Sequence, residues 1–313
     1  MVSVDACSFR TAIPIDRSAS SVRFALLSAL LLAASLQSPA QGIKNSQLFA
    51  QAAKANLDRN FASPAISYLL MDASGNVVAE RWLGPAGCDP RAVSELNSTQ
   101  KPVSPGSLVK PFLAMAYGEQ HGGEFPRVRC LGTRSRCWLP AGHGTLELEE
   151  ALAQSCNTYF LELAAGLDRT RAAQTFARYG LAGPDAQMPD GSLVGLGVGW
   201  RETPLALARA YLRLAKERRQ PIQNRIAKGM LDSAMRGTAR AVDAALGRNA
   251  ALAKTGTAVC SHTPRGAGDG FAVVLYPAAQ PRLLLLLRVH GFTGAESAKV
   301  AGDMLRSLEA SER

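Results

Sequence analysis

The chain has 313 residues, of which 47% are hydrophobic, and its 35 Lys and Arg against 25 Asp and Glu give a net charge of +10. This composition excludes a disordered or collagen-like protein. Only one stretch, residues 24–36, has the apolar character of a membrane segment, and it is short for a span of about 20 residues, which excludes a multi-pass membrane protein. The positive charge permits a nucleic acid, an anionic membrane surface or an acidic polymer as partner, and it selects none of them.

Residues 1–40 are typical of a cleavable export signal. Arg17 and Arg23 precede the apolar run, and Ser38, Pro39 and Ala40 follow it with small residues where a signal peptidase cleaves. An uncleaved N-terminal anchor or a buried helix is the alternative. Cleavage predicts an exported protein, periplasmic or elsewhere in the cell envelope, whose mature part is residues 41–313.

The first half of the mature part predicts a hairpin followed by helices. Residues 41–62 are a helical lead-in, and the β-rich runs 65–72 and 76–82 are joined by a turn at Gly75. A loop rich in Pro, Gly, Ser and Asn follows. From residue 107 to about residues 219–228 the pattern is helical, and Thr203 before Pro204 provides an N-cap and a first helical residue.

Strands return in the last part of the chain, at residues 251–258, 271–276 and 282–290, before a helix at about residues 295–308. The run of leucines at residues 283–287 lacks polar alternation, which predicts a strand covered on both faces. We therefore expect an α/β fold in which a central, mostly antiparallel sheet is built from both chain ends around a helical insert. Residues 41–313 would form one domain.

Five cysteines lie in the predicted mature part: Cys88, Cys130, Cys137, Cys156 and Cys260. In an oxidising compartment neighbouring cysteines pair, and Cys130 and Cys137 are close together in a loop-like stretch, so we predict a disulfide between them. The alternative is a zinc site with His143 and Cys156 as further ligands. The absence of a CxxC pair argues against it, and we expect no metal.

Three short motifs follow one another along the chain: Ser107-Leu108-Val109-Lys110, Ser155-Cys156-Asn157 and Lys254-Thr255-Gly256. A Ser and a Lys three residues apart on a helix share one face, so the amine can reach the hydroxyl. The prolines around the first motif start a helix at about Ser107, at the positive end of the helix dipole. A serine so placed beside a lysine is an activated nucleophile.

Each motif also has an ordinary interpretation. An SxxK arises by chance roughly once in a chain of this composition, and the other two motifs could be a turn and a solvated strand end. In a functional interpretation the second motif adds a hydroxyl for proton relay and an amide that binds substrate. The third adds the positive charge of Lys254, and Gly256 lets the backbone of a substrate approach. Their order on a helix start, a turn and a strand is hard to explain by chance.

At these residues the chain resembles the penicillin-binding serine DD-transpeptidases, which share their motifs with the serine β-lactamases. The resemblance extends to the segments around the motifs, residues 104–112, 137–160, 195–205 and 230–258, and covers nearly all of the mature part. It implies the fold of DD-peptidases and β-lactamases, with the active site at the junction of the sheet and the helical insert.

The resemblance implies acyl transfer at the D-Ala-D-Ala end of peptidoglycan stem peptides, with β-lactams as inhibitors. Ser107 would form the acyl-enzyme, Lys110 would act as base, and Ser155 and Lys254 would relay the proton to the leaving group. The backbone N–H groups of Ser107 and Thr257 would form the oxyanion hole. No cofactor is implied. The residues that would bind the substrate are Asn157, Thr255, Gly256 and Thr257.

Other functions on this scaffold stay open: a DD-carboxypeptidase, a β-lactamase, or a non-catalytic β-lactam sensor or wall-machinery module. The intact motifs argue against the non-catalytic module, and the transpeptidase-like sequence around the second motif favours the transferase. About two dozen residues separate the predicted cleavage site from the first strand, too few for the usual companion domain. We therefore expect other cell-wall proteins to supply it.

A basic cluster lies in the second half of the helical insert, at Lys216, Arg218, Arg219, Arg225 and Lys228. Basic clusters can bind nucleic acid, but no interleaved aromatic residues or nucleic-acid motif accompany this one. Export also argues against DNA. We interpret the cluster as a solvated helix end and expect no nucleic-acid partner.

Overall fold

The computed structural model describes residues 39–83, 98–182, 185, 187–259 and 268–311. The chain divides into two units, Met1–Leu48 and Phe49–Arg313. Most of the predicted export signal, residues 1–38, lies outside the described residues, as do Cys88 and Cys260. Within the described residues, no helix combines the length and the apolar character needed to span a membrane.

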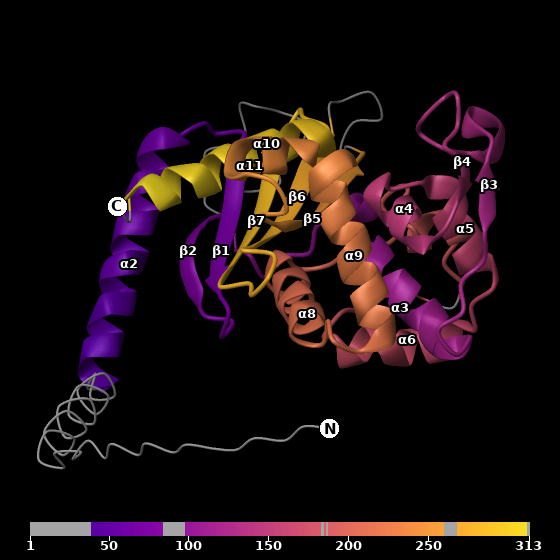
Figure 1. Cartoon of the computed structure of the whole chain (residues 1–313), viewed down its shortest axis with the longest axis horizontal. Helices are drawn as coiled ribbons and strands as arrows, with labels where there is room; N and C mark the ends of the chain where they lie inside the picture. The colour runs from indigo at the N-terminus through magenta and orange to yellow at the C-terminus, as the bar shows by residue number, and fades with distance from the viewer. Residues whose placement is uncertain (1–38, 84–97, 183–184, 186, 260–267, 312–313) are drawn as a thin grey trace, which may run out of the picture. The chain divides into compact units, whose positions relative to one another are not determined.

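The second unit is built on a five-stranded antiparallel sheet in the order β2-β1-β7-β6-β5. Its strands are β1 (Ile66–Asp72), β2 (Val77–Arg81), β5 (Leu252–Ala258), β6 (Asp269–Tyr276) and β7 (Leu283–His290). Strand β1 pairs with β7 along its whole length, so segments from the two ends of the chain close one sheet (Figure 1). The predicted mixed fold with a central antiparallel sheet is confirmed.

Both faces of this sheet are covered, because alternate residues of each strand enter opposite hydrophobic layers. Tyr68 and Leu70 pack in the layer of α10 (Arg240–Leu246) and α11 (Gly294–Ser311), together with Leu57 of α2 (Pro39–Asn60). Leu69 and Met71 enter the layer that includes α8 (Pro204–Lys216). Residues 284–287 of β7 are buried on both sides, which explains why the leucine run lacks polar alternation.

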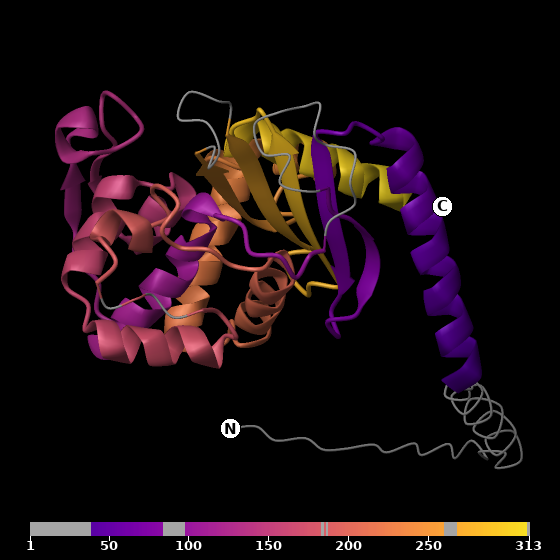
Figure 2. The ribbon, with the colours of Figure 1, turned by 180° about the vertical axis from the view of Figure 1, so that it is seen from behind.

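The chain between β2 and β5 is mainly helical, as predicted. Its longer elements are α3 (Lys110–Gln120), α4 (Leu148–Ala153), α5 (Asn157–Ala165), α6 (Arg169–Arg178), α8 and α9 (Pro221–Arg236), with the short α7 (Asp190–Leu193). Helix α9 packs against both β5 and α4, and it therefore joins the sheet to the helical part (Figures 1 and 2). Thr203 caps α8 by accepting a hydrogen bond from the N–H of Ala206 at 3.1 Å, which confirms the predicted helix start.

Two details differ from the sequence predictions. The first motif begins with a 3-10 turn, η2 (Gly106–Val109), and the α-helix starts only at Lys110, because Pro111 is tolerated solely in the first turn of a helix. The stretch predicted to be wholly helical also contains a small antiparallel ladder, β3 (Val128–Cys130) with β4 (Gly144–Leu146). The 3-10 turn η3 (Gly132–Ser135) lies between these two strands.

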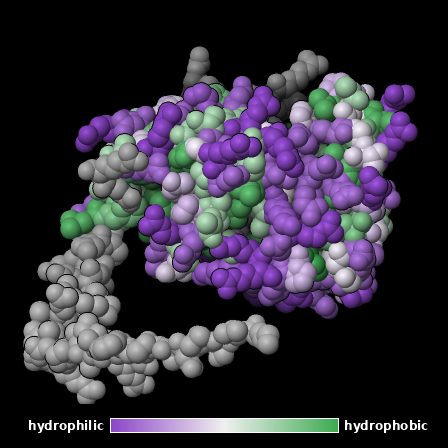
Figure 3. Space-filling view, in the orientation of Figure 1, coloured by the Kyte–Doolittle hydropathy of each residue, from purple (hydrophilic) through white to green (hydrophobic). Residues whose placement is uncertain are grey.

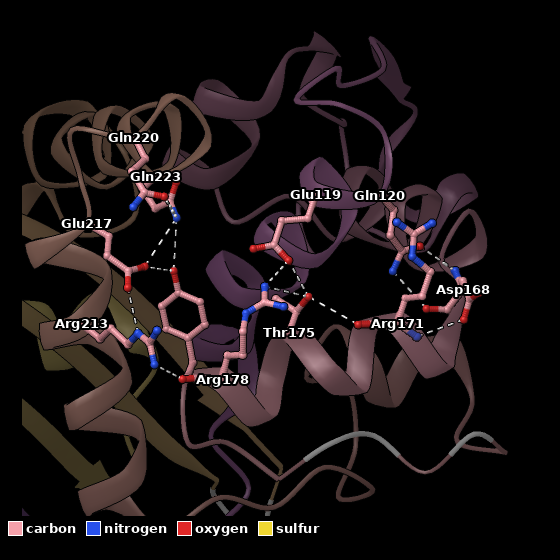
Figure 4. Close-up of polar contacts among 11 residues, drawn as sticks. Glu119, Gln120, Asp168, Arg171, Thr175, Arg178, Arg213, Glu217, Gln220 and Gln223 are labelled. Atoms are coloured by element: carbon pink, nitrogen blue, oxygen red, sulfur yellow. Dashed lines mark hydrogen bonds and ion pairs between the residues drawn. The ribbon is translucent and has the colours of Figure 1, made fainter.

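Polar contacts join helices of the helical part to one another (Figure 4). Glu119 of α3 accepts a hydrogen bond from Arg178 of α6. Glu217, which follows α8, accepts hydrogen bonds from Arg213 at 2.8 Å and from the hydroxyl of Tyr179 at 2.6 Å. Exposed ion pairs each contribute about 0–1 kcal/mol, so these contacts orient the helices more than they stabilise them.

The predicted basic cluster has partners within the protein. Hydrophilic side chains predominate over the helices on the face that Figure 3 shows. Arg225 of the cluster forms a two-pronged ion pair with Glu149, with N–O distances of 2.8 and 3.0 Å. Arg218 donates a hydrogen bond to the backbone carbonyl of Ala279. At least two of the cluster's cations therefore have partners within the protein.

Candidate active site

The three motifs meet at a cleft of about 410 Å³ between η2, the start of α5, β5 and the start of α11. Six of the eight residues expected at the site line it. The two lysines, Lys110 and Lys254, are fully buried beneath it. The lining residues are Ser107, Trp138, Ser155, Asn157, Leu196, Thr238, Thr255, Gly256, Thr257, Thr293, Gly294 and Ala295.

Backbone-to-backbone contact sets the position of Ser107 relative to β5. A Cβ atom on Gly256 would lie 2.6 Å from the carbonyl oxygen of Pro105, and one on Gly106 would lie 2.6 Å from that of Thr257. Gly106 also has a φ of +58°, which L-residues with side chains rarely adopt. Both glycines are therefore required where the 3-10 turn crosses the strand, and they bring the nucleophile beside the third motif.

Lys110 is the centre of a buried polar network. Its Nζ donates to the backbone oxygen of Ser155 at 2.8 Å and to Oδ1 of Asn157 at 2.7 Å, and it lies 3.5 Å from Oγ of Ser155. Nζ of Lys254 donates to the same Oγ at 2.8 Å. Among the described residues, the amine of Lys110 has no hydrogen bond to Ser107. The second motif, rather than the nucleophile, therefore holds the Lys110 side chain here.

Burial changes the charge of both lysines. Desolvation lowers the pKa of Lys110 to about 7, although the neighbouring groups of Cys156 and Cys137 oppose the shift. Desolvation also lowers the pKa of Lys254 well below its usual range, and the charge of Lys110 lowers it further. A neutral amine is a proton acceptor, so Lys110 can act as a general base near neutral pH.

The second motif carries backbone strain. Ser155 has a φ of +51°, in the left-handed region that costs a residue with a side chain about 1–2 kcal/mol. The hydrogen bonds from Lys110 and Lys254 to its carbonyl and hydroxyl oxygens hold it in this conformation. Asn157 follows as the first residue of α5, with Cys156 as N-cap. The turn thus directs a hydroxyl and an amide into the cleft.

Hydroxyl groups from three segments meet on the strand side of the cleft. Oγ1 of Thr255 donates to Oγ1 of Thr238 at 2.6 Å, and Oγ1 of Thr257 accepts a hydrogen bond from the N–H of Gly294 at 2.9 Å. A Cβ atom on Gly294 would lie 2.6 Å from the carbonyl oxygen of Gly256, so α11 can begin this close to β5 only with a glycine. The described residues that line this side of the cleft include no Asp, Glu, Lys or Arg, and Lys254 lies buried beneath it.

The sequence analysis did not include six of these lining residues among the site residues: Trp138, Leu196, Thr238, Thr293, Gly294 and Ala295. Thr238 lies in a segment that resembles the family, and this was the available signal. Trp138 is half exposed and reaches the cleft from the β3–β4 connection, with its Nε1 donating to the carbonyl of Gln154 at 3.2 Å. Trp138 also lies in a segment that resembles the family, residues 137–160, whereas no sequence pattern joined the start of α11 to the motifs.

The predicted disulfide is not present in the structure. Cys130, Cys137 and Cys156 are all buried free thiols. The Sγ atoms of Cys130 and Cys137 both lie 3.5 Å from Nδ1 of His143, because the turn between the two cysteines directs them toward the imidazole. The four side chains of the rejected zinc alternative are therefore together, immediately beside the second motif.

The chain matches the family model for the penicillin-binding protein transpeptidase domain over residues 84–308. No curated protein matches the chain. Several solved structures have a similar fold. One is PBP2 of Pseudomonas aeruginosa in complex with WCK 5153, which is 21% identical with a TM-score of 0.66, and the match covers 84% of this chain and 73% of that one.

Two further structures have the same fold. The transpeptidase domain of penicillin-binding protein 3 from Burkholderia pseudomallei is 16% identical with a TM-score of 0.61, and the match covers 86% of this chain and 93% of that domain. PBP2 of Helicobacter pylori in complex with MreC is 17% identical with a TM-score of 0.67, and the match covers 82% and 62% of the two chains.

Proposed function

The chain belongs to the penicillin-binding protein transpeptidase domain family, and on that premise we propose that it is a serine acyltransferase acting on the D-Ala-D-Ala end of peptidoglycan stem peptides. One observation carries this proposal: two buried lysines, Lys110 and Lys254, share the hydroxyl of Ser155 beneath a cleft that exposes Ser107. This arrangement can both accept a proton from a nucleophile and deliver one to a leaving group.

In the first step, Oγ of Ser107 attacks the carbonyl carbon of the penultimate D-Ala. Lys110, whose lowered pKa keeps a large fraction of its amine neutral, takes the hydroxyl proton as the C–O bond forms. The oxygen of the tetrahedral intermediate becomes negatively charged. Backbone N–H groups of Ser107 and Thr257 would stabilise it, each contributing about 3–4 kcal/mol.

Collapse of the intermediate breaks the peptide bond and releases the terminal D-Ala as an amine. The nitrogen must gain a proton as it leaves, and the hydroxyl of Ser155 is the natural donor, since it lies between the two lysines. Lys110 returns a proton to Ser155 through the same contact. Atoms and charge balance: one ester bond to Ser107 forms, one amide bond breaks, and one proton moves from the serine to the departing amine.

The strand side of the cleft suits the terminal carboxylate of the substrate. Thr255 and Thr257 line the cleft where β5 approaches the start of α11, and Lys254 lies buried beneath them. The pKa of Lys254 is lowered in the unliganded site by burial and by Lys110. A carboxylate bound nearby would favour the protonated amine, because an opposite charge offsets the cost of desolvation.

The second step transfers the acyl group to an amine of another stem peptide. Hydrolysis by a water molecule would make the protein a carboxypeptidase or a β-lactamase instead. Class A β-lactamases deacylate with a glutamate that activates water. No Asp or Glu occurs among the described residues that line the cleft. This favours a long-lived acyl-enzyme and therefore a transpeptidase that penicillin blocks.

A fluorescent penicillin tests the acyl-enzyme. We expect covalent labelling of the wild-type protein, no labelling of Ser107→Ala, and normal labelling of Ser74→Ala, whose side chain is exposed in the β1–β2 turn. A stable adduct supports a penicillin-binding DD-peptidase such as a transpeptidase, whereas release within the assay time supports a β-lactamase. Labelling that persists in Ser107→Ala, or its absence from the wild type together with absence of β-lactam hydrolysis, would refute the proposal.

We also propose that the protein is exported and acts in the cell envelope, where its family works. The support is the pattern of Arg17, Arg23 and the apolar run within residues 1–40. Mass spectrometry of the N-terminus of the protein recovered from the envelope fraction tests this. We expect a mature protein that begins near residue 41, and an intact residue 1 would contradict cleavage.

A further inference from the structure

Four side chains with metal-binding atoms converge beside the second motif: Cys130, Cys137, His143 and Cys156. Their ligand atoms all lie within 4.8 Å of one another. Sγ of Cys137 is 3.8 Å from Sγ of Cys156. Nδ1 of His143 is 3.5 Å from Sγ of Cys130 and also 3.5 Å from Sγ of Cys137. A tetrahedral zinc site with ordinary Zn–S and Zn–N bonds has edges of about 3.5–3.8 Å.

The local chain is folded tightly to bring three of these residues together. Cys130 ends β3, Cys137 follows the 3-10 turn η3, and His143 directly precedes β4. A Cβ atom on Gly132 would lie 1.9 Å from the carbonyl oxygen of Pro140, and one on Gly142 would lie 2.5 Å from that of Cys130. This backbone contact closes the loop, so no CxxC pair is needed to bring the cysteines together.

The fourth residue comes from a different part of the chain. Cys156 is the N-cap of α5 and is fully buried, and it lies in the second motif between Ser155 and Asn157. The N-terminus of a helix favours negative charge, which suits a thiolate ligand. The β3–β4 extension lies beside α5 (Figures 1 and 2), and the cluster therefore joins this extension to the catalytic turn.

The sulfur atoms receive hydrogen bonds that stabilise thiolates. The hydroxyl of Thr158 donates to Sγ of Cys130 at 3.3 Å, and the backbone N–H of Gly132 donates to the same atom. Cys137 accepts from the backbone N–H groups of Leu139 and Asn157. Donors around ligand sulfurs orient them and raise the affinity of a metal site. Isolated buried thiols would not need so many.

A disulfide explains this cluster less well than a metal does. Any one disulfide uses two of the three thiols and leaves the third thiol and the imidazole without a function. A zinc ion uses all four groups. Three sulfurs and one nitrogen in a tetrahedral arrangement are the ligands that zinc prefers, and no position remains open for water. The site would therefore be structural.

We propose that Cys130, Cys137, His143 and Cys156 bind one zinc ion in a closed structural site that holds the β3–β4 loop against the second motif. Binding converts the coordinating thiols to thiolates and releases their protons to solvent. The metal then restrains Cys156 and Cys137, whose neighbours Ser155 and Trp138 line the cleft. This last consequence depends on the proposed function, whereas the metal site itself does not.

Metal analysis of the full-length protein, purified without oxidant or chelator, tests the site. We expect about one zinc per chain in the wild type and in His121→Ala, whose imidazole is exposed at the end of α3, and near-complete loss in His143→Ala. Replacement of zinc by cobalt should produce the intense sulfur-to-cobalt absorption of tetrahedral thiolate sites. Removal of zinc should lower Tm by about 5 °C or more.

The outcomes separate the metal site from the alternatives without relying on enzyme activity. A Cys130–Cys137 disulfide found by mass spectrometry in a metal-free wild type overturns the proposal, and so do three free thiols without metal. Zinc retained by both His143→Ala and Cys130→Ser would place the metal elsewhere and overturn the assignment. Bound zinc in a protein that penicillin does not label would leave the metal site standing and refute only the proposed function.

Discussion

The two sides of the active-site cleft are positioned by different kinds of contact. On the strand side, backbone atoms do most of the positioning: β5 pairs with β6, and Gly256 allows the 3-10 turn of the nucleophile to approach at main-chain distance. On the helix side, the buried amine of Lys110 determines the arrangement by binding Ser155 and Asn157. The geometry of the strand side depends on glycines, which have no side chain. The geometry of the helix side depends on a few polar or charged side chains.

This difference separates positioning from reactivity. A sheet edge holds its shape through many hydrogen bonds, so single polar substitutions there should move it little. A buried network of polar groups is expensive to leave partly unsatisfied, at about 1–3 kcal/mol for each orphaned group. On the helix side, loss of one amine should therefore slow acylation strongly. On the strand side, the addition of one methyl group should slow it.

The largest effect is expected from Lys110→Ala. It removes the general base and leaves the polar atoms of Ser155 and Asn157 without their donor, so the rate of acylation by penicillin should fall about 10³-fold. Stopped-flow measurement of labelling checks this, with Lys54→Ala, exposed on α2, as the matched control. A fall of less than about tenfold would mean that another group accepts the proton from Ser107.

Gly256→Ala tests the strand side. The new methyl group would lie 2.6 Å from the carbonyl of Pro105, so β5 and the nucleophile turn must separate. Misplacement of this order costs about 10²-fold in rate, and overpacking costs about 1–3 kcal/mol of stability. Gly191→Ala is the control, because its nearest neighbour would be at 3.8 Å. Equal acylation rates in the two variants would show that the close approach does not position Ser107.

The pH profile of acylation tests the helix side in the unmodified protein. Only neutral Lys110 can accept the proton, and burial places its pKa at about 7. The rate should therefore rise with pH through about 7 and be about tenfold lower near pH 6 than on the plateau. Lys254 faces the same hydroxyl and its pKa is lowered too, while Cys156 and Cys137 oppose the shift. A flat profile would exclude Lys110 as the titrating base.

The sequence predicted much of the fold because its signals are local. Strand β7 was recognisable from its leucine run, α8 from Thr203 and Pro204, and the three motifs from their order. The joining of the two chain ends in one sheet followed from the order of the strands and from the resemblance. The predicted start of α3 was three residues too early. Proline is tolerated in the first turn of an α-helix, so the prolines around the first motif did not show that a 3-10 turn comes before the α-helix.

The cysteine cluster shows where local signals fail. We predicted a disulfide between Cys130 and Cys137 because they are close in sequence. In the structure, close backbone contacts at Gly132 and Gly142 fold the loop, and both cysteines lie beside His143 and Cys156. A pattern search for CxxC cannot detect such a site. Trp138 reaches the cleft through the same loop; the family resemblance covered it, but nothing in the sequence indicated that its side chain enters the cleft.

The smallest effect is expected from Thr238, which the strand side uses as a support. Its Oγ1 accepts a hydrogen bond from Thr255 at 2.6 Å, so Thr238→Val keeps the volume and leaves the hydroxyl of Thr255 without this partner. One neutral hydrogen bond is worth about 0.5–1.5 kcal/mol, which predicts a two- to tenfold loss in acylation efficiency. The loss should appear as weaker binding of penicillin rather than slower chemistry, because Thr255 belongs to the side that receives the carboxylate.

Thr238→Ser restores the hydroxyl and should restore binding. If the valine variant instead slowed acylation at saturating penicillin, the hydroxyl pair would act on the reacting groups, and the division between a positioning side and a reactive side would be wrong.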